Sequence, residues 1–136
     1  MALLWPGPAP AEPLRQSTPA ISEARDVARV TVQELRKQLA EKQAIVVDVR
    51  DAVAFASGHI PGALHVPAKE IPTRANEIRR AAGSRSVVLY CSCPAEQSAA
   101  EAGLFLLQHG LERAAALIGG YPAWIHSGGA AEGPKP

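Results

Sequence analysis

This chain of 136 residues contains few cysteines and few aromatic residues, and its net charge is small. Only two cysteines are present, which excludes a secreted scaffold held by several disulfides and points to a reducing compartment, the cytoplasm. The net charge is +1 and no aromatic residue lies among Arg79, Arg80 and Arg85, so nothing indicates a nucleic-acid partner. No apolar run approaches the roughly 18 residues needed to cross a bilayer, so we expect no direct insertion into a membrane.

The two ends of the chain differ in composition from its middle. Residues 1–25 contain five prolines among alanine and glycine, a composition that favours extended, weakly ordered backbone. The remaining length is enough for one domain with its own core. We therefore predict a disordered tail or linker over 1–25, a folded domain over 26–128 and a disordered tail over 129–136.

Strand and helix signals alternate from Val27 onward. Short apolar runs predict buried strands at 27–30, 45–49, 63–66, 86–90 and 114–118. Thr31, Asp51 and Ser98 stand where they can cap helices, and further helices are expected at 72–82 and 122–126. Strands separated by helices at this spacing indicate an α/β fold with a parallel sheet flanked by helices.

The stretch from Val87 to Ser98 carries the strongest functional signal. A buried strand ends at Cys91, a polar loop follows, and the next helix is expected to open at Ser98. Functional groups of parallel sheets gather beyond the carboxyl ends of the strands. Loop N–H groups and a helix N-terminus favour a thiolate, so we expect the pKa of Cys91 to lie below that of a free thiol. This pattern predicts chemistry at the sulfur of Cys91.

Four separated motifs resemble, in order and spacing, those of a single rhodanese domain, over about residues 27–127. They are Val47-Asp48-Val49-Arg50-Asp51, Gly58-His59-Ile60-Pro61-Gly62-Ala63, Tyr90-Cys91 and Gly119-Gly120-Tyr121-Pro122-Ala123-Trp124. The resemblance implies a rhodanese-like α/β fold with a five-stranded parallel sheet and helices on both faces. It also implies a sulfurtransferase without a cofactor, in which Cys91 takes a sulfane sulfur from thiosulfate or a persulfide. The Cys91 persulfide would then pass that sulfur to a thiol or cyanide.

The same resemblance assigns roles around the cysteine. Asp48 and Arg50 would form an ion pair that shapes the pocket, and His59 would either hold the turn before the third strand or move a proton. The loop that binds the substrate or its anion would consist of Ser92, Cys93, Pro94, Ala95, Glu96, Gln97 and Ser98. The glycine pair at 119–120 should let the last loop approach this site.

The loop after Cys91 departs from the usual pattern of the family. Glu96 and Gln97 stand at its end, where rhodanese loops usually carry a basic side chain that holds an anionic donor. Its length is similar to that of the phosphatase and arsenate-reductase relatives, but Gln97 replaces their arginine, so neither activity is favoured. A persulfide donor is favoured over thiosulfate. A nearby carboxylate such as Glu96 would oppose a thiolate, depending on its direction.

The second cysteine and the loop sequence leave several interpretations open. Cys93 is either a spectator that fixes the loop or a second thiol that shuttles sulfur or forms a disulfide with Cys91. Two cysteines cannot complete a zinc site, and no histidine has ligand spacing to them, so no metal is expected. The Cys-Ser-Cys-Pro-x-Glu form is similar to rhodanese domains appended to DedA-type membrane proteins, which is compatible with attachment to such a protein.

Three functions therefore follow from the residues and the resemblance. The first is a sulfurtransferase that works through a Cys91 persulfide. The second is a rhodanese-like module for interaction or sensing with little or no catalysis, which the missing loop cation favours. The third is a thiol–disulfide domain in which Cys91 and Cys93 cycle, although a disulfide across so short a loop is strained.

Overall fold

A computed structural model describes residues 21–133 of the chain. The sheet has five parallel strands in the order β1-β5-β4-β2-β3. The strands are β1 (Ala28–Val30), β2 (Ala44–Asp48), β3 (Leu64–His65), β4 (Ser86–Tyr90) and β5 (Ala114–Leu117). This architecture confirms the expected α/β fold with its five-stranded parallel sheet.

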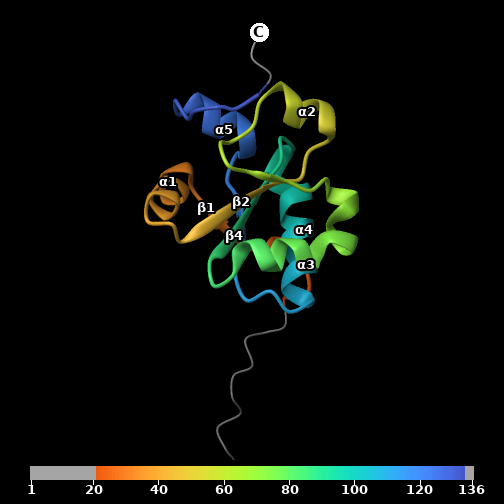
Figure 1. Cartoon of the computed structure of the whole chain (residues 1–136). Coiled ribbons are helices and arrows are strands. Elements are labelled where there is room, and N and C mark those ends of the chain that lie inside the picture. Colours follow the sequence, from red (N-terminus) through yellow and green to blue (C-terminus); the bar gives the residue numbers. More distant parts are fainter. Residues whose placement is uncertain (1–20, 134–136) are drawn as a thin grey trace, which may run out of the picture.

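Helices cover both faces of the sheet, as predicted (Figure 1). On one face the core is built from α3 (Ile71–Ala82) and α4 (Gln97–Gln108), and on the other from α1 (Val32–Ala40) and α5 (Gly120–His126). The short helix α2 (Ala52–Ser57) lies above the sheet, near α5, in Figure 1. Strands covered on both faces are largely apolar, which agrees with the sequences Ile45-Val46-Val47 in β2 and Val87-Val88-Leu89 in β4.

Two of the predicted helix starts are confirmed in detail. The Thr31 hydroxyl accepts from the N–H of Glu34, and the Glu34 carboxylate accepts in return from the N–H of Thr31. The Asp51 carboxylate accepts from the N–H of Ala54 at 2.8 Å and begins α2. In each case a side chain satisfies an N–H that the first turn of a helix leaves free.

The predicted start of α4 is wrong. The helix begins at Gln97, one residue before the expected Ser98, and the expected capping box from Ser98 to Glu101 does not form. The N–H of Ser98 is instead directed to the sulfur of Cys93, at 3.2 Å. A side chain from the preceding loop has therefore taken the place of the local cap.

Segments at both ends of the described chain contact the domain. Ile21 packs on the core beside α4, and a short 3-10 helix, η1 (Ala24–Asp26), leads into β1. At the other end, the indole N–H of Trp124 donates to the carbonyl oxygen of Ala130, and Glu132 pairs with His59 in an antiparallel bridge. Most of the predicted first tail, residues 1–20, lies outside the described residues, as do residues 134–136 of the second.

Candidate active site

Cys91 follows β4 directly, at the carboxyl edge of the sheet, and is 4% exposed. The N–H of Tyr121 donates to its carbonyl oxygen at 2.9 Å, which joins the loop after β5 to the loop after β4. This approach requires a glycine at position 120, where φ is 56° and a Cβ would overlap the same carbonyl oxygen. The prediction that the glycine pair lets the last loop reach Cys91 is confirmed.

The loop after Cys91 contains a short 3-10 turn, η3 (Pro94–Glu96), before α4 begins. Ala95 and Glu96 both have left-handed backbone conformations, with φ of 54° and 55°. Such conformations cost about 1–2 kcal/mol for each residue other than glycine, so other contacts must hold the loop in place. Ser92 and Pro94 are exposed, and Gln97 donates to Glu101 on the surface of α4 at 3.2 Å.

Glu96 provides contacts that hold this loop. One of its carboxylate oxygens accepts from the N–H of Gly119 at 2.8 Å, and the other accepts from the guanidinium of Arg29 on β1 at 3.3 Å. The side chain is only 14% exposed. The carboxylate is therefore engaged by β1 and by the segment after β5, and its negative charge is balanced by Arg29.

The surroundings of the two sulfur atoms differ from the expectation. Burial raises the pKa of Cys91, a hydrogen bond with Cys93 raises it further, and the N–H groups of Cys93 and Ala99 lower it by less. The prediction of a lowered pKa for Cys91 is therefore wrong. Burial also acts to raise the pKa of Cys93, but hydrogen bonds from the Cys91 thiol and the Ser98 N–H outweigh it and lower the pKa.

Asp48 and Arg50 form the ion pair that the motif predicts. Asp48 is fully buried, and its carboxylate accepts from Arg50 side-chain nitrogens at 2.7–3.2 Å and from the Arg50 backbone N–H at 2.8 Å. The Arg50 guanidinium also donates to the carbonyl oxygen of Gly58 and stacks on the ring of Tyr121, 4.1 Å from its centre. The pair thus joins the end of β2 to α2 and to the loop that contacts Cys91.

Tyr90 extends this network into the core. Its hydroxyl accepts from the N–H of Ile60 at 3.0 Å and is hydrogen-bonded to Asp48. Burial, followed by the hydrogen bond with Asp48, raises the pKa of Tyr90 far above its ordinary value. The phenol is therefore a permanent hydrogen-bonding group and not a proton carrier at neutral pH.

His59 belongs to the turn before β3. Its Nδ1 lies 2.8 Å from the carbonyl oxygen of Phe55, its ring stacks on the Phe55 ring, and its Nε2 lies 3.6 Å from a Glu132 carboxylate oxygen. These contacts are those of a histidine that holds a turn, the first of the two roles left open by the sequence.

The described residues also give negative findings for other kinds of site. Between Ile21 and Gly133, no three histidine, cysteine or acidic side chains gather as they would around a metal ion. Over the same residues, no helix combines the length and apolar composition that a membrane span requires.

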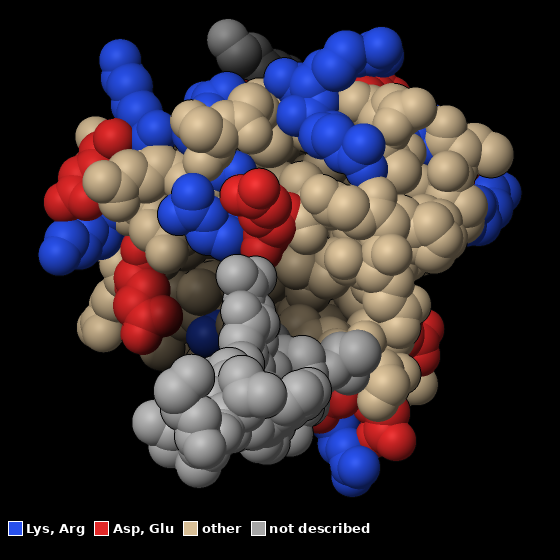
Figure 2. All heavy atoms as spheres, turned by 90° about the horizontal axis from the view of Figure 1, so that it is seen from below, with Lys and Arg blue, Asp and Glu red and all other residues tan. Residues whose placement is uncertain are grey.

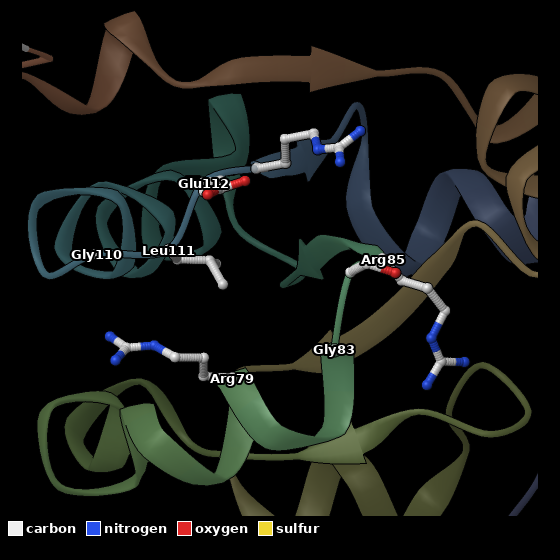
Figure 3. A pocket seen from close by; sticks show the side chains of 8 residues that line it. Arg79, Gly83, Arg85, Gly110, Leu111 and Glu112 are labelled. Atoms are coloured by element: carbon white, nitrogen blue, oxygen red, sulfur yellow. The ribbon is translucent and has the colours of Figure 1, made fainter.

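A surface hollow of about 450 Å³ lies at the other end of the sheet, near the start of β4 and β5. Figure 3 shows Arg79 extending beneath the turn at Gly110, with Arg85 on the other side of Gly83. Arg79 donates to the carbonyl oxygen of His109, and Arg85 donates to the carbonyl oxygens of Ala81 and Ala82. These guanidiniums satisfy the carboxyl ends of helices, and Figure 2 shows basic and acidic side chains mixed on this end of the molecule.

Replacing Glu96 by alanine is expected to loosen the loop. The change removes the acceptor of the Gly119 N–H and the partner of Arg29, and should lower the free energy of unfolding by about 1–2 kcal/mol. Glu96→Gln is the matched control, because its amide oxygen can still accept from Gly119, and it should cost less. Hydrogen exchange at the Gly119 amide checks this, and equal exchange rates in Glu96→Ala and the wild type would contradict the role given to Glu96.

Comparison with known proteins agrees with this architecture. The rhodanese-like domain family matches residues 31–127. A sulfurtransferase of Allochromatium vinosum is 36% identical over 103 residues, which cover 75% of this chain and 92% of that protein.

Solved structures give the same result for the fold. A Bacillus halodurans protein of known crystal structure is 31% identical in sequence to this chain. The match covers 78% of this chain and 77% of that protein's chain, with a TM-score of 0.68. A human single-domain sulfurtransferase is 24% identical in sequence. The match covers 74% of this chain and 96% of that protein's chain, with a TM-score of 0.64. From its sequence, its fold and these relatives, the chain belongs to the family of rhodanese-like domains.

Proposed function

We propose that this protein is a sulfurtransferase that carries a sulfane sulfur on Cys91 as a persulfide. The observation that supports this most is the position of Cys91, buried directly after β4 and at the start of the loop that leads into α4. Amide N–H groups around a strand end can hold the anionic outer sulfur of a persulfide. The relatives named as sulfurtransferases support the same assignment.

The reaction has two steps. In the first, the sulfur of Cys91 attacks the outer sulfur of a donor, the sulfur–sulfur bond of the donor breaks, and its inner sulfur leaves with the electron pair. In the second, a thiol or cyanide attacks the outer sulfur of the Cys91 persulfide, and Cys91 leaves as the thiolate. Asp48, Arg50 and His59 keep the surrounding segments in place through the contacts described above.

The charge of the loop indicates the class of donor. Residues 92–98 contain no lysine or arginine, and the one charged side chain among them, Glu96, is paired with Arg29. A doubly charged anion such as thiosulfate therefore finds no cation on this loop, whereas a thiol persulfide needs less compensation. We propose persulfides as the better donors.

Steady-state kinetics with two donors test this proposal. With cyanide as acceptor, kcat/KM for glutathione persulfide should exceed that for thiosulfate by about tenfold or more. A tenfold ratio is about as large as the contribution of one modest ion pair between an anionic donor and a loop cation. Gln97→Arg is the informative variant, because it places a guanidinium at the exposed end of the loop. It should raise kcat/KM for thiosulfate about tenfold and change that for the persulfide little. A clear preference of the wild type for thiosulfate would contradict the proposed donor class.

A second candidate, an interaction or sensing module without turnover, is favoured by one observation. Burial raises the pKa of Cys91, so that this thiol alone is a poor nucleophile at neutral pH. Absence of turnover with both donors, in a protein that unfolds cooperatively, would support the module and contradict the sulfurtransferase.

A further inference from the structure

Residues 129–133, which we call the strap, follow α5 and cross the surface of the domain toward α2 (Figure 1). The N–H of Gly129 donates to the carbonyl oxygen of Trp124 at 2.9 Å, and the indole N–H of Trp124 donates to the carbonyl oxygen of Ala130 at 2.7 Å. These two bonds fix the beginning of the strap to α5. The strap begins after residue 127, where the match to the rhodanese-like domain family ends.

The far end of the strap is bonded to the turn before β3. The N–H of His59 donates to the carbonyl oxygen of Glu132 at 2.7 Å, and the N–H of Glu132 donates to the carbonyl oxygen of His59 at 2.8 Å. One Glu132 carboxylate oxygen accepts from the N–H of Gly62 at 3.4 Å and lies 3.6 Å from the Nε2 of His59. A Cβ at position 133 would lie 3.1 Å from the Cα of Gly58. The strap therefore holds this turn through backbone and side-chain contacts.

The peptide group between His59 and Ile60 links the strap to the end of β4. Its carbonyl oxygen accepts from the N–H of Glu132, and its N–H donates to the hydroxyl of Tyr90 at 3.0 Å. Tyr90 is the last residue of β4, directly before Cys91. Because a peptide group is planar and rigid, a movement of its carbonyl oxygen also moves its N–H. The strap and the residue before Cys91 are thus bonded to the two sides of one rigid unit.

The peptide group between Gly58 and His59 forms a second link. Its N–H donates to the carbonyl oxygen of Glu132, and its carbonyl oxygen accepts from the guanidinium of Arg50 at 2.6 Å. That guanidinium lies over the ring of Tyr121, whose hydroxyl oxygen would be 2.6 Å from a Cβ at position 58. The N–H of Tyr121 donates to the carbonyl oxygen of Cys91 at 2.9 Å. Both peptide groups of His59 therefore lie between the strap and the surroundings of Cys91.

The strap contributes little to the hydrophobic core. Among the described residues, none of 129–133 belongs to the buried core on either face of the sheet, and the Glu132 side chain is 58% exposed. Loss of the strap bonds should therefore leave the sheet and its helices folded. Its effect should fall on the turn that the strap holds.

We propose that the strap positions Cys91 for reaction, with Glu132 as a positioning residue that acts through the two peptide groups of His59. The proposal deepens the sulfurtransferase function above and rests on it. Attack on a donor sulfur depends on the direction from which the nucleophile approaches, so a small displacement of Cys91 lowers the rate of this step. The strap would thus make the rate of sulfur transfer depend on a surface segment that does not contact the reacting sulfur atoms.

Hydrogen exchange in Glu132→Pro tests the structural part of the proposal, because proline has no N–H to donate to the carbonyl oxygen of His59. Exchange at the amides of Ile60 and Tyr121 should become about tenfold faster, since the turn that holds them opens more often. The amide of Val87, at the start of β4 and the other end of the sheet, should exchange at the wild-type rate. Unchanged exchange at Ile60 and Tyr121, or equal acceleration of all three amides, would overturn the local role of the strap.

Single-turnover loading of sulfur from glutathione persulfide tests the functional part. In Glu132→Pro the limiting rate at saturating donor should fall about tenfold, while the donor concentration at half of that rate should change by less than about twofold. Glu112→Pro is the matched control, because it makes the same replacement in an exposed loop at the other end of the sheet, and should load at the wild-type rate. Glu132→Gln keeps the backbone bonds and an oxygen that can accept from Gly62, so it should recover most of the rate.

The outcomes separate this proposal from the proposed function. A wild-type loading rate in Glu132→Pro, even with faster exchange at Ile60 and Tyr121, would overturn the positioning role and leave the sulfurtransferase intact. Equal slowing in Glu132→Pro and Glu112→Pro would overturn it as well, since the effect would not be specific to the strap. Absence of sulfur on Cys91 in the wild type would contradict the proposed function itself, and hydrogen exchange would still decide whether the strap holds the turn.

Discussion

Replacing Cys91 by serine is expected to reduce sulfur transfer by about 10³-fold or more with every donor. A serine hydroxyl does not form the sulfur–sulfur bond on which the reaction depends. Cys93 remains in this variant, but it lies in the loop and not directly after β4, where Cys91 stands. We therefore expect Cys93 not to replace Cys91 as the carrier of the persulfide that turnover requires.

Steady-state rates with glutathione persulfide and cyanide measure this effect. Serine is almost isosteric with cysteine, so thermal unfolding should show that the variant keeps its fold. Ser84→Ala is the control for a neutral change, because Ser84 is exposed and lies at the other end of the sheet. Turnover by Cys91→Ser within tenfold of the wild type would place the chemistry on another residue.

Replacing Asp48 by alanine is expected to have the largest effect on stability. Asp48 is fully buried and is the partner of Arg50, whose side chain is only 9% exposed. Loss of one partner of a buried ion pair leaves the other charge uncompensated, which costs about 3–5 kcal/mol. The Tyr90 hydroxyl also loses a hydrogen-bonding partner. For a domain of this size we expect a fall in Tm of roughly 10–20 °C.

Asp51→Ala is the matched control for this variant. It removes a carboxylate three residues along the chain, but Asp51 is exposed and caps α2 through one hydrogen bond. The loss of such a cap costs about 1 kcal/mol. Equal losses of stability in the two variants, measured by urea unfolding, would show that the Asp48–Arg50 pair does not organise this edge of the sheet.

The fold could be predicted because its information is local. Each strand is an apolar run, and each of the caps at Thr31 and Asp51 is a contact between residues three apart. The place of Cys91 follows from topology, since the end of a central parallel strand lies at the functional edge of the sheet. Asp48 and Arg50 could be paired for the same reason, as they are two residues apart.

The contacts that hold the loop could not be predicted, because their partners are distant in the sequence. Glu96 is 67 residues from Arg29 and 23 from Gly119. An isolated carboxylate near a cysteine suggests an unfavourable charge, and only the fold shows that both oxygens are engaged elsewhere. Arg29, the N–H of Gly119 and the Glu132 partner of His59 were missed for this reason.

The start of α4 and the pKa of Cys91 were wrong for related reasons. The pattern from Ser98 to Glu101 matches a capping box, but Cys93 takes the N–H of Ser98, and Ala95 and Glu96 turn the chain in a left-handed conformation. The sequence indicates the amides that lower a thiol pKa but not the burial that raises it. The cytoplasmic location and attachment to a membrane protein stay predictions.

The most direct test of the central claim is to locate the transferred sulfur. The wild-type protein is loaded with glutathione persulfide, its free thiols are blocked, and the peptide with both cysteines is fragmented between them in a mass spectrometer. The account predicts one additional sulfur atom on Cys91 and none on Cys93. An additional sulfur on Cys93 alone, or none on either cysteine of the folded protein, would contradict it.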